Sequence, residues 1–549
     1  MQRIPAKRGG RSRYTQTEIL NPGRGLNTLI SDNLIDDKEA SSLENIMFVE
    51  SGAPAKAYGF TNVGSGLSNN PRGLAFFNDT QAGNRDLLTV DGTSLKYLNS
   101  STWTTVSGAS FDSSSQVNFT QALGDMYIWD GVNGGAKLAT GRTLTRPGTM
   151  PKARFSIFYG GYHWCAGVDG QLSRLYRSVL TDSADFTNDP SVTDPTPDNS
   201  TDVPGATVFA GTGSGSAIAQ FVDINKNDGD KITGLAKFQD VLIIFKERSI
   251  FQLTLGADGT PTVSAVSKSY GCVGHRSIDN VDNDLFFLTR NGIYVLGNEP
   301  NYYSVIRTNE LSSRIHPVIE TINPTSYSLA TALFNQYVFY LGIPSGGVTA
   351  NNVTLTYDRR FLAFSKLTHI QPECFTVYTD TTNTDTIYFT SASSANVYKF
   401  TTNYDSNGSA ISAQWTSKAF DLGDFSQYKR FIFIDLLFRQ LVGTVSINVY
   451  TDNGVLLKST SVSSSQSGGM GTNILGGGDL LGGTVSSSSS GTSSVSSNIP
   501  YRIKVNSKSR TIKVQISNGR INETFVLLGI KLYTRPYSSF VFPSAQKIS

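Results

Sequence analysis

A short apolar strand, a polar turn and a second strand recur from about residue 56 to residue 410, and this repetition constrains the fold more than any other feature of the sequence. Turns rich in Gly, Asn, Asp and Ser between two such strands are typical of β-hairpins. The sequence predicts hairpins with the paired strands Leu87–Val90 and Leu95–Leu98, Met126–Trp129 and Ala136–Leu138, Tyr162–Ala166 and Leu172–Tyr176, Val241–Phe245 and Ile250–Leu253, Leu285–Leu288 and Ile293–Leu296, Tyr337–Leu341 and Val353–Tyr357, and Ile387–Thr390 and Val397–Phe400.

Successive hairpins are 39, 36, 79, 44, 53 and 49 residues apart, measured between Leu87, Met126, Tyr162, Val241, Leu285, Val338 and Ile387. Repeats of ~40 to 50 residues, each able to supply a four-stranded sheet, are typical of a β-propeller. The 79-residue interval fits either an unrecognised blade or a loop insertion, and the Asp and Pro residues of 181–205 favour the insertion. Residues 56–410 are therefore predicted to form a β-propeller of six or seven blades with an acidic Pro-rich loop near 181–205.

Longer alternating strands follow after residue 410. Apolar side chains alternate at Phe431 and Phe433, at Val445, Ile447 and Val449, at Ile503 and Val505, and at Ile512, Val514 and Ile516, before the run Phe525–Ile530. Alternation with a period of two indicates strands with one buried face. We expect a β-sandwich-like domain over residues 411–549, with a Ser/Gly-rich insertion near 461–498 that cannot bury enough apolar surface to order itself alone.

The N-terminal segment, residues 1–55, is predicted to be a basic arm and a short helix. The arm carries Arg3, Lys7, Arg8, Arg11 and Arg13 and no acidic residue within its first fourteen positions. Three interpretations of these cations remain open: docking into an acidic groove of a partner subunit, contact with DNA phosphates, or a solvated tail.

The helix is predicted from a pattern further along the N-terminal segment. Asp36 and Glu39 have the spacing of a capping box, which predicts a helix that continues to about Asn45.

Composition limits the function classes. The 549 residues include 46 Lys and Arg and 43 Asp and Glu, so the net charge of +3 gives no argument for nucleic-acid or membrane binding by the whole surface. Cys165, Cys272 and Cys374 form no CxxC pair, and no apolar run approaches the ~18 to 20 residues of a membrane span. We expect no integral membrane segment, no signal peptide and assembly in the cytoplasm.

No catalytic or metal-binding motif stands out. The four histidines are not spaced as metal ligands, so no metal and no cofactor is predicted. Asp223, Asn225 and Asn227 imitate the first ligands of a calcium loop, but Asp228 and Gly234 replace its Gly and Glu, and a polar turn is the preferred interpretation. Aromatic residues such as Trp129 and Trp164 lie within hairpins, where they more often fill a core than bind a sugar.

Several segments together resemble one family. They are Gly25-Leu26-Asn27, Asp36-Asp37-Lys38-Glu39-Ala40, Leu43-Glu44-Asn45-Ile46, Tyr58-Gly59-Phe60, Asp228-Gly229-Asp230-Lys231-Ile232-Thr233-Gly234-Leu235, Val241-Leu242-Ile243-Ile244-Phe245-Lys246-Glu247-Arg248-Ser249-Ile250, Trp415-Thr416-Ser417-Lys418-Ala419-Phe420-Asp421-Leu422-Gly423, and Leu528-Gly529-Ile530-Lys531-Leu532-Tyr533. This chain resembles the tail nozzle β-propeller proteins of short-tailed bacteriophages. The motifs are structural signatures, so no catalytic residue is carried over.

The resemblance implies a structural virion protein and no enzyme. Proteins of this family form a hexameric ring below the portal and adaptor, retain the packaged DNA and later conduct it without sequence recognition, and anchor tail fibres or spikes. A strongly cationic lining would hold phosphates, so we expect the channel to be neutral or acidic. Two alternatives are a receptor- or carbohydrate-binding propeller of the tail and a propeller glycosidase, which needs two carboxylates ~5 to 10 Å apart that the sequence cannot identify.

Overall fold

The computed structural model describes residues 14–49, 51–180, 182–186, 208–210, 220–257, 259–299, 302–452, 454–464 and 499–536. Their regular structure is almost entirely antiparallel β-sheet, which confirms the all-β class. The helices within these residues are short: α1 (His316–Ile319) and the 3₁₀ helices η1 (Thr140–Arg142), η2 (His275–Ser277), η3 (Ser313–Ile315) and η4 (Tyr327–Leu329).

Two compact units share the chain. The first contains Met1–Gly59, Arg360–Lys366 and Asn403–Ser549, and the second contains Phe60–Arg359 and Leu367–Thr402. The described part of the first 55 residues therefore belongs to the same unit as the C-terminal residues, and does not form a separate region as the sequence suggested.

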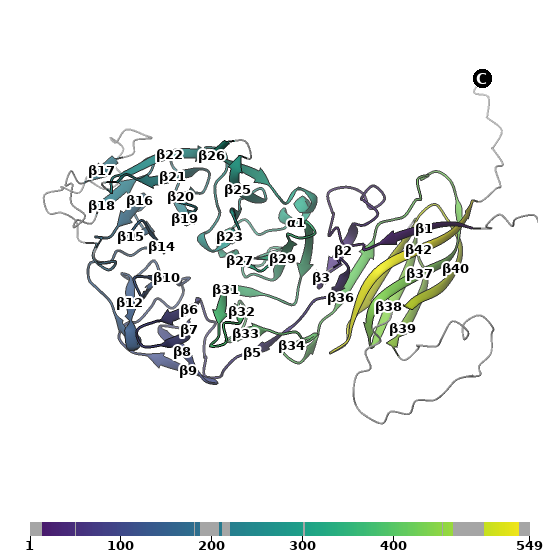
Figure 1. Cartoon of the computed structure of the whole chain (residues 1–549), viewed down its shortest axis with the longest axis horizontal. Helices are drawn as coiled ribbons and strands as arrows, with labels where there is room; N and C mark the ends of the chain where they lie inside the picture. The colour runs from purple at the N-terminus through teal and green to yellow at the C-terminus, as the bar shows by residue number, and fades with distance from the viewer. Residues whose placement is uncertain are drawn as a thin grey trace, which may run out of the picture. The chain divides into compact units, whose positions relative to one another are not determined.

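The second unit consists of sheets formed by consecutive strands (Figure 1). The first three are β6 (Leu74–Asp79), β7 (Asn84–Asp91), β8 (Ser94–Asn99) and β9 (Thr102–Val106); β10 (Asn118–Ala122), β11 (Asp125–Trp129), β12 (Ala136–Ala139) and β13 (Thr143–Thr145); and β14 (Phe155–Tyr159), β15 (Tyr162–Val168), β16 (Gln171–Arg177), β18 (Gln220–Asp223) and β17 (Val208–Ala210).

Four further sheets complete this unit. The fourth and fifth are β19 (Ile232–Phe238), β20 (Val241–Lys246), β21 (Ile250–Leu255) and β22 (Pro261–Ser267), then β23 (Asp279–Val281), β24 (Asp284–Leu288), β25 (Ile293–Glu299) and β26 (Tyr302–Glu310). The sixth begins with β27 (Thr331–Asn335), β28 (Val338–Ile343) and β29 (Val353–Asp358), after which the chain continues into β30 (Ala363–Leu367). The seventh contains β31 (Pro372–Thr379), β32 (Asp385–Ser391), β33 (Val397–Phe400) and β5 (Phe60–Asn62).

Strand pairing confirms every predicted hairpin. Val90 pairs with Leu95, for example, and Phe245 pairs with Ile250. The corresponding pairs β11–β12, β15–β16, β24–β25, β28–β29 and β32–β33 are also antiparallel neighbours. The 79-residue interval contains an insertion between β16 and β18 of the third sheet, and no additional sheet is present in the described residues of that interval.

The sheets of the second unit follow one another around a common centre. Figure 1 shows the first strand of each sheet nearest this centre, from β6 through β10, β14, β19, β23 and β27 to β31. The early strand β5 pairs with β33, with Phe60 opposite Phe400, so a segment from the start of the unit completes its last sheet. This pairing ties the two ends of the sheet series together.

Apolar cores lie between consecutive sheets. Leu88 of the first sheet and Met126 of the second belong to one buried cluster, and Trp164 of the third and Leu242 of the fourth belong to another. Further clusters join the second sheet to the third, the fourth to the fifth and the seventh to the first. Burial of these side chains is the main force that holds neighbouring sheets together.

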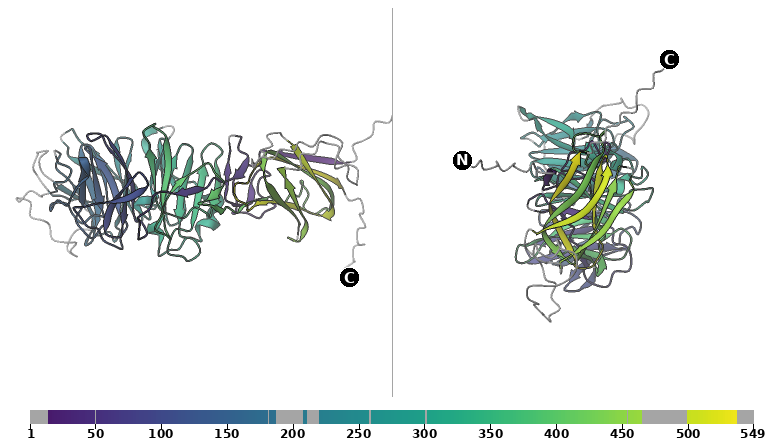
Figure 2. Two further views of the ribbon diagram at one scale, coloured as in Figure 1. Left: turned by 90° about the horizontal axis from the view of Figure 1, so that it is seen from below. Right: turned by 90° about the vertical axis from the view of Figure 1, so that its right-hand side faces the viewer.

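The first unit contains two sheets. One has the order β3 (Ile46–Phe48), β4 (Pro54–Lys56), β42 (Thr524–Pro536), β37 (Lys429–Val442) and β40 (Ile499–Ser509), with β1 (Thr15–Leu20) also paired to β42. The other has the order β2 (Ala40–Glu44), β36 (Ala413–Ser417), β41 (Ile512–Asn518), β38 (Thr444–Thr451) and β39 (Leu456–Ser463). The short pair β34 (Asp405–Ser406) and β35 (Ser409–Ala410) precedes them, and the long strands are seen in the right-hand view of Figure 2.

The predicted helix from Asp36 to Asn45 is wrong. The Asp36 N–H does donate to the Glu39 carboxylate at 3.0 Å, as half of a capping box would require, but the next residues form strand β2. Leu43 pairs with Trp415 of β36, and both side chains are buried. Strand pairing and burial against a distant part of the chain therefore override the local helix signal.

The expected alternation is confirmed in β38 and β41 but not in β37. Val445, Ile447 and Val449 are all fully buried. In β37 the register shifts between Phe431 and Phe433, as in a β-bulge, so Phe431 is buried whereas Phe433 lies on the opposite face against Tyr533.

Candidate functional site

The predicted site residues Arg3, Lys7, Arg8, Arg11 and Arg13 lie outside the described residues, as do most of the acidic Pro-rich loop and most of the Ser/Gly-rich insertion. The roles expected of these residues therefore stay predictions. Polar clusters that the sequence did not identify are found inside the second unit.

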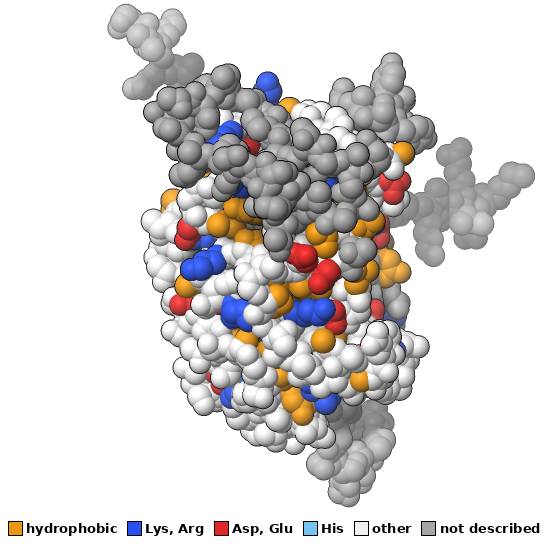
Figure 3. Space-filling view, turned by 90° about the vertical axis from the view of Figure 1, so that its left-hand side faces the viewer, with side chains coloured by type: hydrophobic (Ala, Val, Ile, Leu, Met, Phe, Trp, Pro, Cys, Tyr) orange, Lys and Arg blue, Asp and Glu red, His pale blue; other side chains and the backbone are white. Residues whose placement is uncertain are grey.

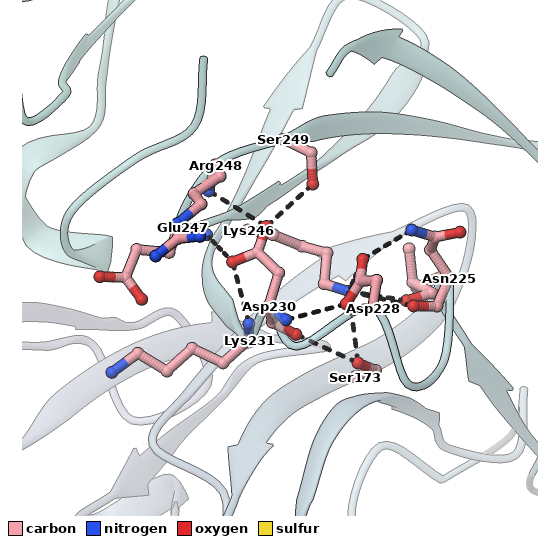
Figure 4. A network of polar contacts seen from close by, with 10 residues as sticks. Ser173, Asn225, Asp228, Asp230, Lys231, Lys246, Glu247, Arg248 and Ser249 are labelled. Carbon is pink, nitrogen blue, oxygen red and sulfur yellow. Dashed lines mark hydrogen bonds and ion pairs between the residues drawn. The ribbon is translucent and has the colours of Figure 1, made fainter. Parts of the chain in front are cut away.

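Lys246 is the centre of the network in Figure 4. Its side chain is fully buried at the end of β20, and its ammonium lies 2.7 Å from each carboxylate oxygen of Asp228. The same ammonium donates to the carbonyl oxygens of Ile224 at 3.1 Å and Asn225 at 3.3 Å, and to the hydroxyl of Ser173 at 3.3 Å. Because Ser173 belongs to the third sheet and Lys246 to the fourth, this network connects the two sheets.

Asp230 organises the turn between β20 and β21. One carboxylate oxygen accepts the N–H of Glu247 at 2.9 Å, and the other accepts the N–H of Arg248 and the hydroxyl of Ser249, both at 3.1 Å (Figure 4). The carboxylate thus satisfies donors that the tight turn would leave without partners. Asp228, Asp230 and Lys246 all come from the segments that carry the family resemblance, and each has a structural role.

Asp223 and Asn225, which imitate calcium ligands in the sequence, also make contacts within the protein. Asp223 makes a two-pronged ion pair with the buried guanidinium of Arg174, at 2.8 and 3.1 Å. The Asn225 amide donates to Asp228 at 2.6 Å, and Lys246 supplies the positive charge next to the loop. These residues form a polar turn ahead of β19, as predicted, and cations of the chain itself lie next to the carboxylates.

Arg276 crosses the centre of the second unit. It belongs to η2, ahead of the fifth sheet, and its side chain is 9% exposed. The guanidinium donates to the Asn118 side chain at 3.0 Å and to the Val117 carbonyl at 2.6 Å, next to the second sheet. It also donates to the Arg72 carbonyl beside the first sheet and lies 3.5 Å from the Glu373 carboxylate of the seventh. One side chain therefore ties four sheets together.

Two carboxyl groups near this centre are perturbed by burial. Burial raises the pKa of Glu373, and the positive charges of Arg276 and Arg72 oppose that change. Burial also raises the pKa of Asp279 to about 6, although the N–H groups of Phe334 and Asn280 donate to it. Perturbed carboxyl groups beside a cavity are typical of functional sites, but buried structural ion pairs produce the same effect.

Two cavities flank Arg276 within the second unit. The larger has a volume of about 580 Å³, and its polar lining includes Arg154, Lys231 and His275. The smaller, of about 450 Å³, is lined by Asp279 and by apolar residues of β6, β27 and β31. Asp130 at the larger cavity accepts N–H groups of its own turn, and Asp169 pairs with Arg154 at 2.9 Å. The carboxylates at the larger cavity thus have partners within the protein.

His163 is a core residue of this unit. The Nδ1–H of His163 donates to the Ser183 carbonyl at 2.9 Å, which leaves Nε2 to accept from the Ser156 hydroxyl at the same distance. Burial lowers the pKa of His163 to about 4, and burial together with Arg276 lowers the pKa of His275 to about 4. Trp129 and Trp164 are fully buried, so the prediction that they fill the core is confirmed.

No group of three or more His, Cys, Asp and Glu side chains in the described residues could hold a metal ion. No helix in this part of the chain is long and apolar enough to cross a membrane.

Sequence reasoning missed Arg276. It lies in the segment Gly271-Cys272-Val273-Gly274-His275-Arg276, which has no strand periodicity and no charge pairing within the segment. The backbone groups that it contacts are 97 to 204 residues away in the chain. The two glycines of this segment are the one sign of close packing in the sequence. In the structure, a Cβ atom at Gly274 would lie 2.9 Å from the backbone oxygen of Ser328.

Comparisons with known proteins give distant similarity only. No family model matches the chain, and no curated protein matches it. Among solved structures, the extracellular domain of a putative one component system from B. thetaiotaomicron is 13% identical, with 68% of this chain and 43% of that chain covered and a TM-score of 0.30. The extracellular domain of a putative hybrid two component system from the same organism is 12% identical over the same shares, with a TM-score of 0.29. This chain therefore spans less than half of either protein.

Proposed function

We propose that this protein is a structural component of the tail of a short-tailed bacteriophage, where copies of the chain form a nozzle below the portal and adaptor. In this proposal the second unit is a seven-bladed β-propeller and the first unit is a β-sandwich-like domain. The nozzle retains genomic DNA before infection, conducts it afterwards and anchors fibres or spikes, without catalysing a reaction.

One observation carries the proposal: residues of the segments that resemble nozzle proteins fasten sheets to one another. Asp228 and Lys246 connect the third and fourth sheets, and Leu43 pairs with Trp415 inside the first unit. Motifs that stabilise a scaffold favour a structural role, because an enzyme's signature would place reactive groups at an accessible site.

Arg276 supports a channel formed between subunits. Its guanidinium bridges the centre of the second unit, where it is buried against groups from opposite sheets. A duplex about 20 Å across could not pass a centre that one arginine spans. Conduction of DNA would therefore require a ring of several copies, and a hexamer follows from the resemblance alone. Heterologous contacts that close into a ring fit such an assembly.

The composition of an isolated tail complex tests the proposal. Tails detached from native particles are expected to contain this chain in a fixed ratio of six copies per tail, next to the portal and adaptor proteins. Quantitative mass spectrometry of the purified complex measures that ratio. Absence of the chain from a complex that contains portal and adaptor would contradict the proposal.

The basic arm is proposed to dock this chain onto a partner subunit. Deletion of residues 1–14 removes Arg3, Lys7, Arg8, Arg11 and Arg13 together, and of the described residues it removes Tyr14 alone. The truncated chain is expected to fold but to be lost from particles. Normal incorporation would contradict the docking proposal.

The larger cavity favours one second candidate, a receptor- or carbohydrate-binding propeller. Its volume of about 580 Å³ and its polar lining suit a small saccharide. A glycan array with the isolated protein tests this candidate, and Lys231→Ala at the cavity wall is the matched variant. Binding that is lost in this variant would favour the receptor binder, whereas an array without binding would remove it.

A further inference from the structure

One face of the first unit carries cations in adjacent positions on neighbouring strands. The basic face consists of Arg430 on β37, Lys504 and Lys508 on β40, Arg510 just beyond β40 and Arg535 on β42. All are exposed except Arg535, which is half-buried. The right-hand view of Figure 2 shows the long green and yellow strands of this unit.

Strand register places these cations on one face. Arg430 lies directly opposite Lys508 on one side and Arg535 on the other, so three cations form a row across three strands. Lys504 lies opposite Phe433 in the following row. Side chains directly opposite each other share a face, and like charges in this position are destabilising. The arrangement therefore costs folding free energy.

Aromatic rings lie between the cations. The Lys508 ammonium is 5.0 Å and the Arg510 guanidinium 4.9 Å from the centre of the Tyr428 ring. Arg535 lies 4.4 Å from the centre of the Tyr14 ring. Tyr428 and its two cations thus form an exposed unit that offers both charge and a flat ring surface.

Two cations at the other end of this face lie next to carboxylates. Arg502 makes a two-pronged pair with Asp435 at 2.8 Å, and Lys531 lies 3.7 Å from Glu18. By contrast, Lys504 and Arg510 have no ion-pair partner in the described part of the chain, and Arg430 is held by the side-chain oxygen of Asn506 at 3.0 Å. Lys504 and Arg510 thus lie beyond the part of this face where carboxylates neutralise the cations.

The face of the second unit that is seen in Figure 3 differs from the basic face, because its visible blue and red groups lie side by side. The concentration of positive charge on the basic face is therefore a local feature that the net charge of +3 conceals.

We propose that the basic face binds the phosphate backbone of DNA without reading its sequence. Neighbouring strands are about 4.8 Å apart and alternate residues on a strand about 6.6 Å, so the cations are closely spaced. Duplex DNA presents one phosphate per roughly 3.4 Å of axis on each strand, a density that several closely spaced cations can meet at once. This inference deepens the proposed function, because it names a surface that could hold DNA while the rest of a channel stays neutral.

The acidic Pro-rich loop of a second copy is a poorer match. Its six Asp residues, between positions 182 and 202, are three to five positions apart. Fully extended, such a chain places its carboxylates about 10 to 18 Å apart. An extended loop could therefore face only one or two of the five cations at a time, whereas DNA presents closely spaced phosphates without having to bend.

Charge reversal on the full-length chain tests the proposal. The test variant is Lys504→Glu with Arg510→Glu, since neither side chain has an ion-pair partner to disrupt. The matched control is Lys237→Glu with Lys268→Glu, which makes the same change in charge at exposed positions of the second unit. Fluorescence anisotropy with a labelled 30-base-pair duplex measures the dissociation constant at several salt concentrations, and thermal unfolding verifies the fold.

The test variant is expected to bind at least about tenfold more weakly, with a salt dependence reduced by about two counterions, while the control matches the natural chain. Equal affinities for both variants, or no binding by the natural chain at low salt, would overturn the proposal. Binding of a labelled peptide of residues 181–205, lost only in the test variant and without DNA binding, would overturn it in favour of a subunit contact. These outcomes do not depend on where the chain lies in a particle, so they can be separated from the proposed nozzle function.

Discussion

The ammonium of Lys246 lies 2.7 Å from both carboxylate oxygens of Asp228, and its side chain is inaccessible to solvent. A buried charge is tolerated only when it is paired and hydrogen-bonded, and here three further acceptors complete the shell. The pair connects the third and fourth sheets, so it should matter for the rigidity of the whole second unit.

Asp228→Asn is expected to lower the free energy of unfolding by about 3 to 5 kcal/mol, because it leaves the buried Lys246 without its counter-charge. Chemical denaturation measures the loss. Arg154→Ala provides the control, since its pair with Asp169 is more than half exposed and should contribute less than about 1 kcal/mol. Equal losses in the two variants would contradict the structural role of the buried pair.

Arg276→Met is expected to destabilise the protein by about 3 to 5 kcal/mol, since it removes the bridge and leaves the Glu373 carboxylate without its cation. The loss should shrink as the pH is lowered, because burial raises the pKa of Glu373 and the folded state then takes up the proton first. Adding Glu373→Gln to this variant should restore part of the stability at pH 8. If the double variant were less stable than Arg276→Met, the ion pair would not be the cause.

The buried histidines predict a loss of stability in mild acid. The pKa values of His163 and His275 are lowered to about 4, so between pH 6.5 and 4 the unfolded chain binds protons that the folded chain does not. Each histidine should therefore reduce the free energy of unfolding by about 3 kcal/mol over this range. Asp279 has the opposite effect on the free energy of unfolding. Because its pKa is raised to about 6, the folded chain binds this proton at a higher pH than the unfolded chain does.

Two variants separate these contributions. His163→Asn should flatten the fall in unfolding free energy between pH 6.5 and 4, and Asp279→Asn should steepen it. Urea titrations at several pH values measure both slopes. Slopes that stay unchanged in both variants would show that other groups control the acid response.

Calcium is expected to leave the thermal midpoint unchanged, because Arg174 already occupies Asp223 and Lys246 occupies Asp228. Thermal scans with excess calcium and with a chelator test this expectation. A midpoint that rises with calcium would show that the loop at residues 223–228 binds the ion after all.

Local patterns in the sequence predicted the hairpins, because a turn and its two strands are neighbours in the chain. Val90 and Leu95, for example, are five positions apart and pair as expected. The helix expected after Asp36 failed because the partner of Leu43 is Trp415, which no local rule can find.

Two further features show the same limit. The bulge that turns Phe433 to the other face depends on the register with both neighbouring strands, and the sequence of β37 alone does not reveal it. Arg276 was not predicted, since its partners come from three separate segments of the chain. The buried polar clusters were thus predictable only as turns, whereas their contacts required the fold.

The location of the chain in native particles tests the central claim most directly. Gold-labelled antibodies raised against the Ser/Gly-rich insertion near 461–498 can be imaged by electron microscopy. The nozzle proposal predicts label confined to the tail end, around the axis of the particle. Label on peripheral appendages, or on free protein alone, would contradict it.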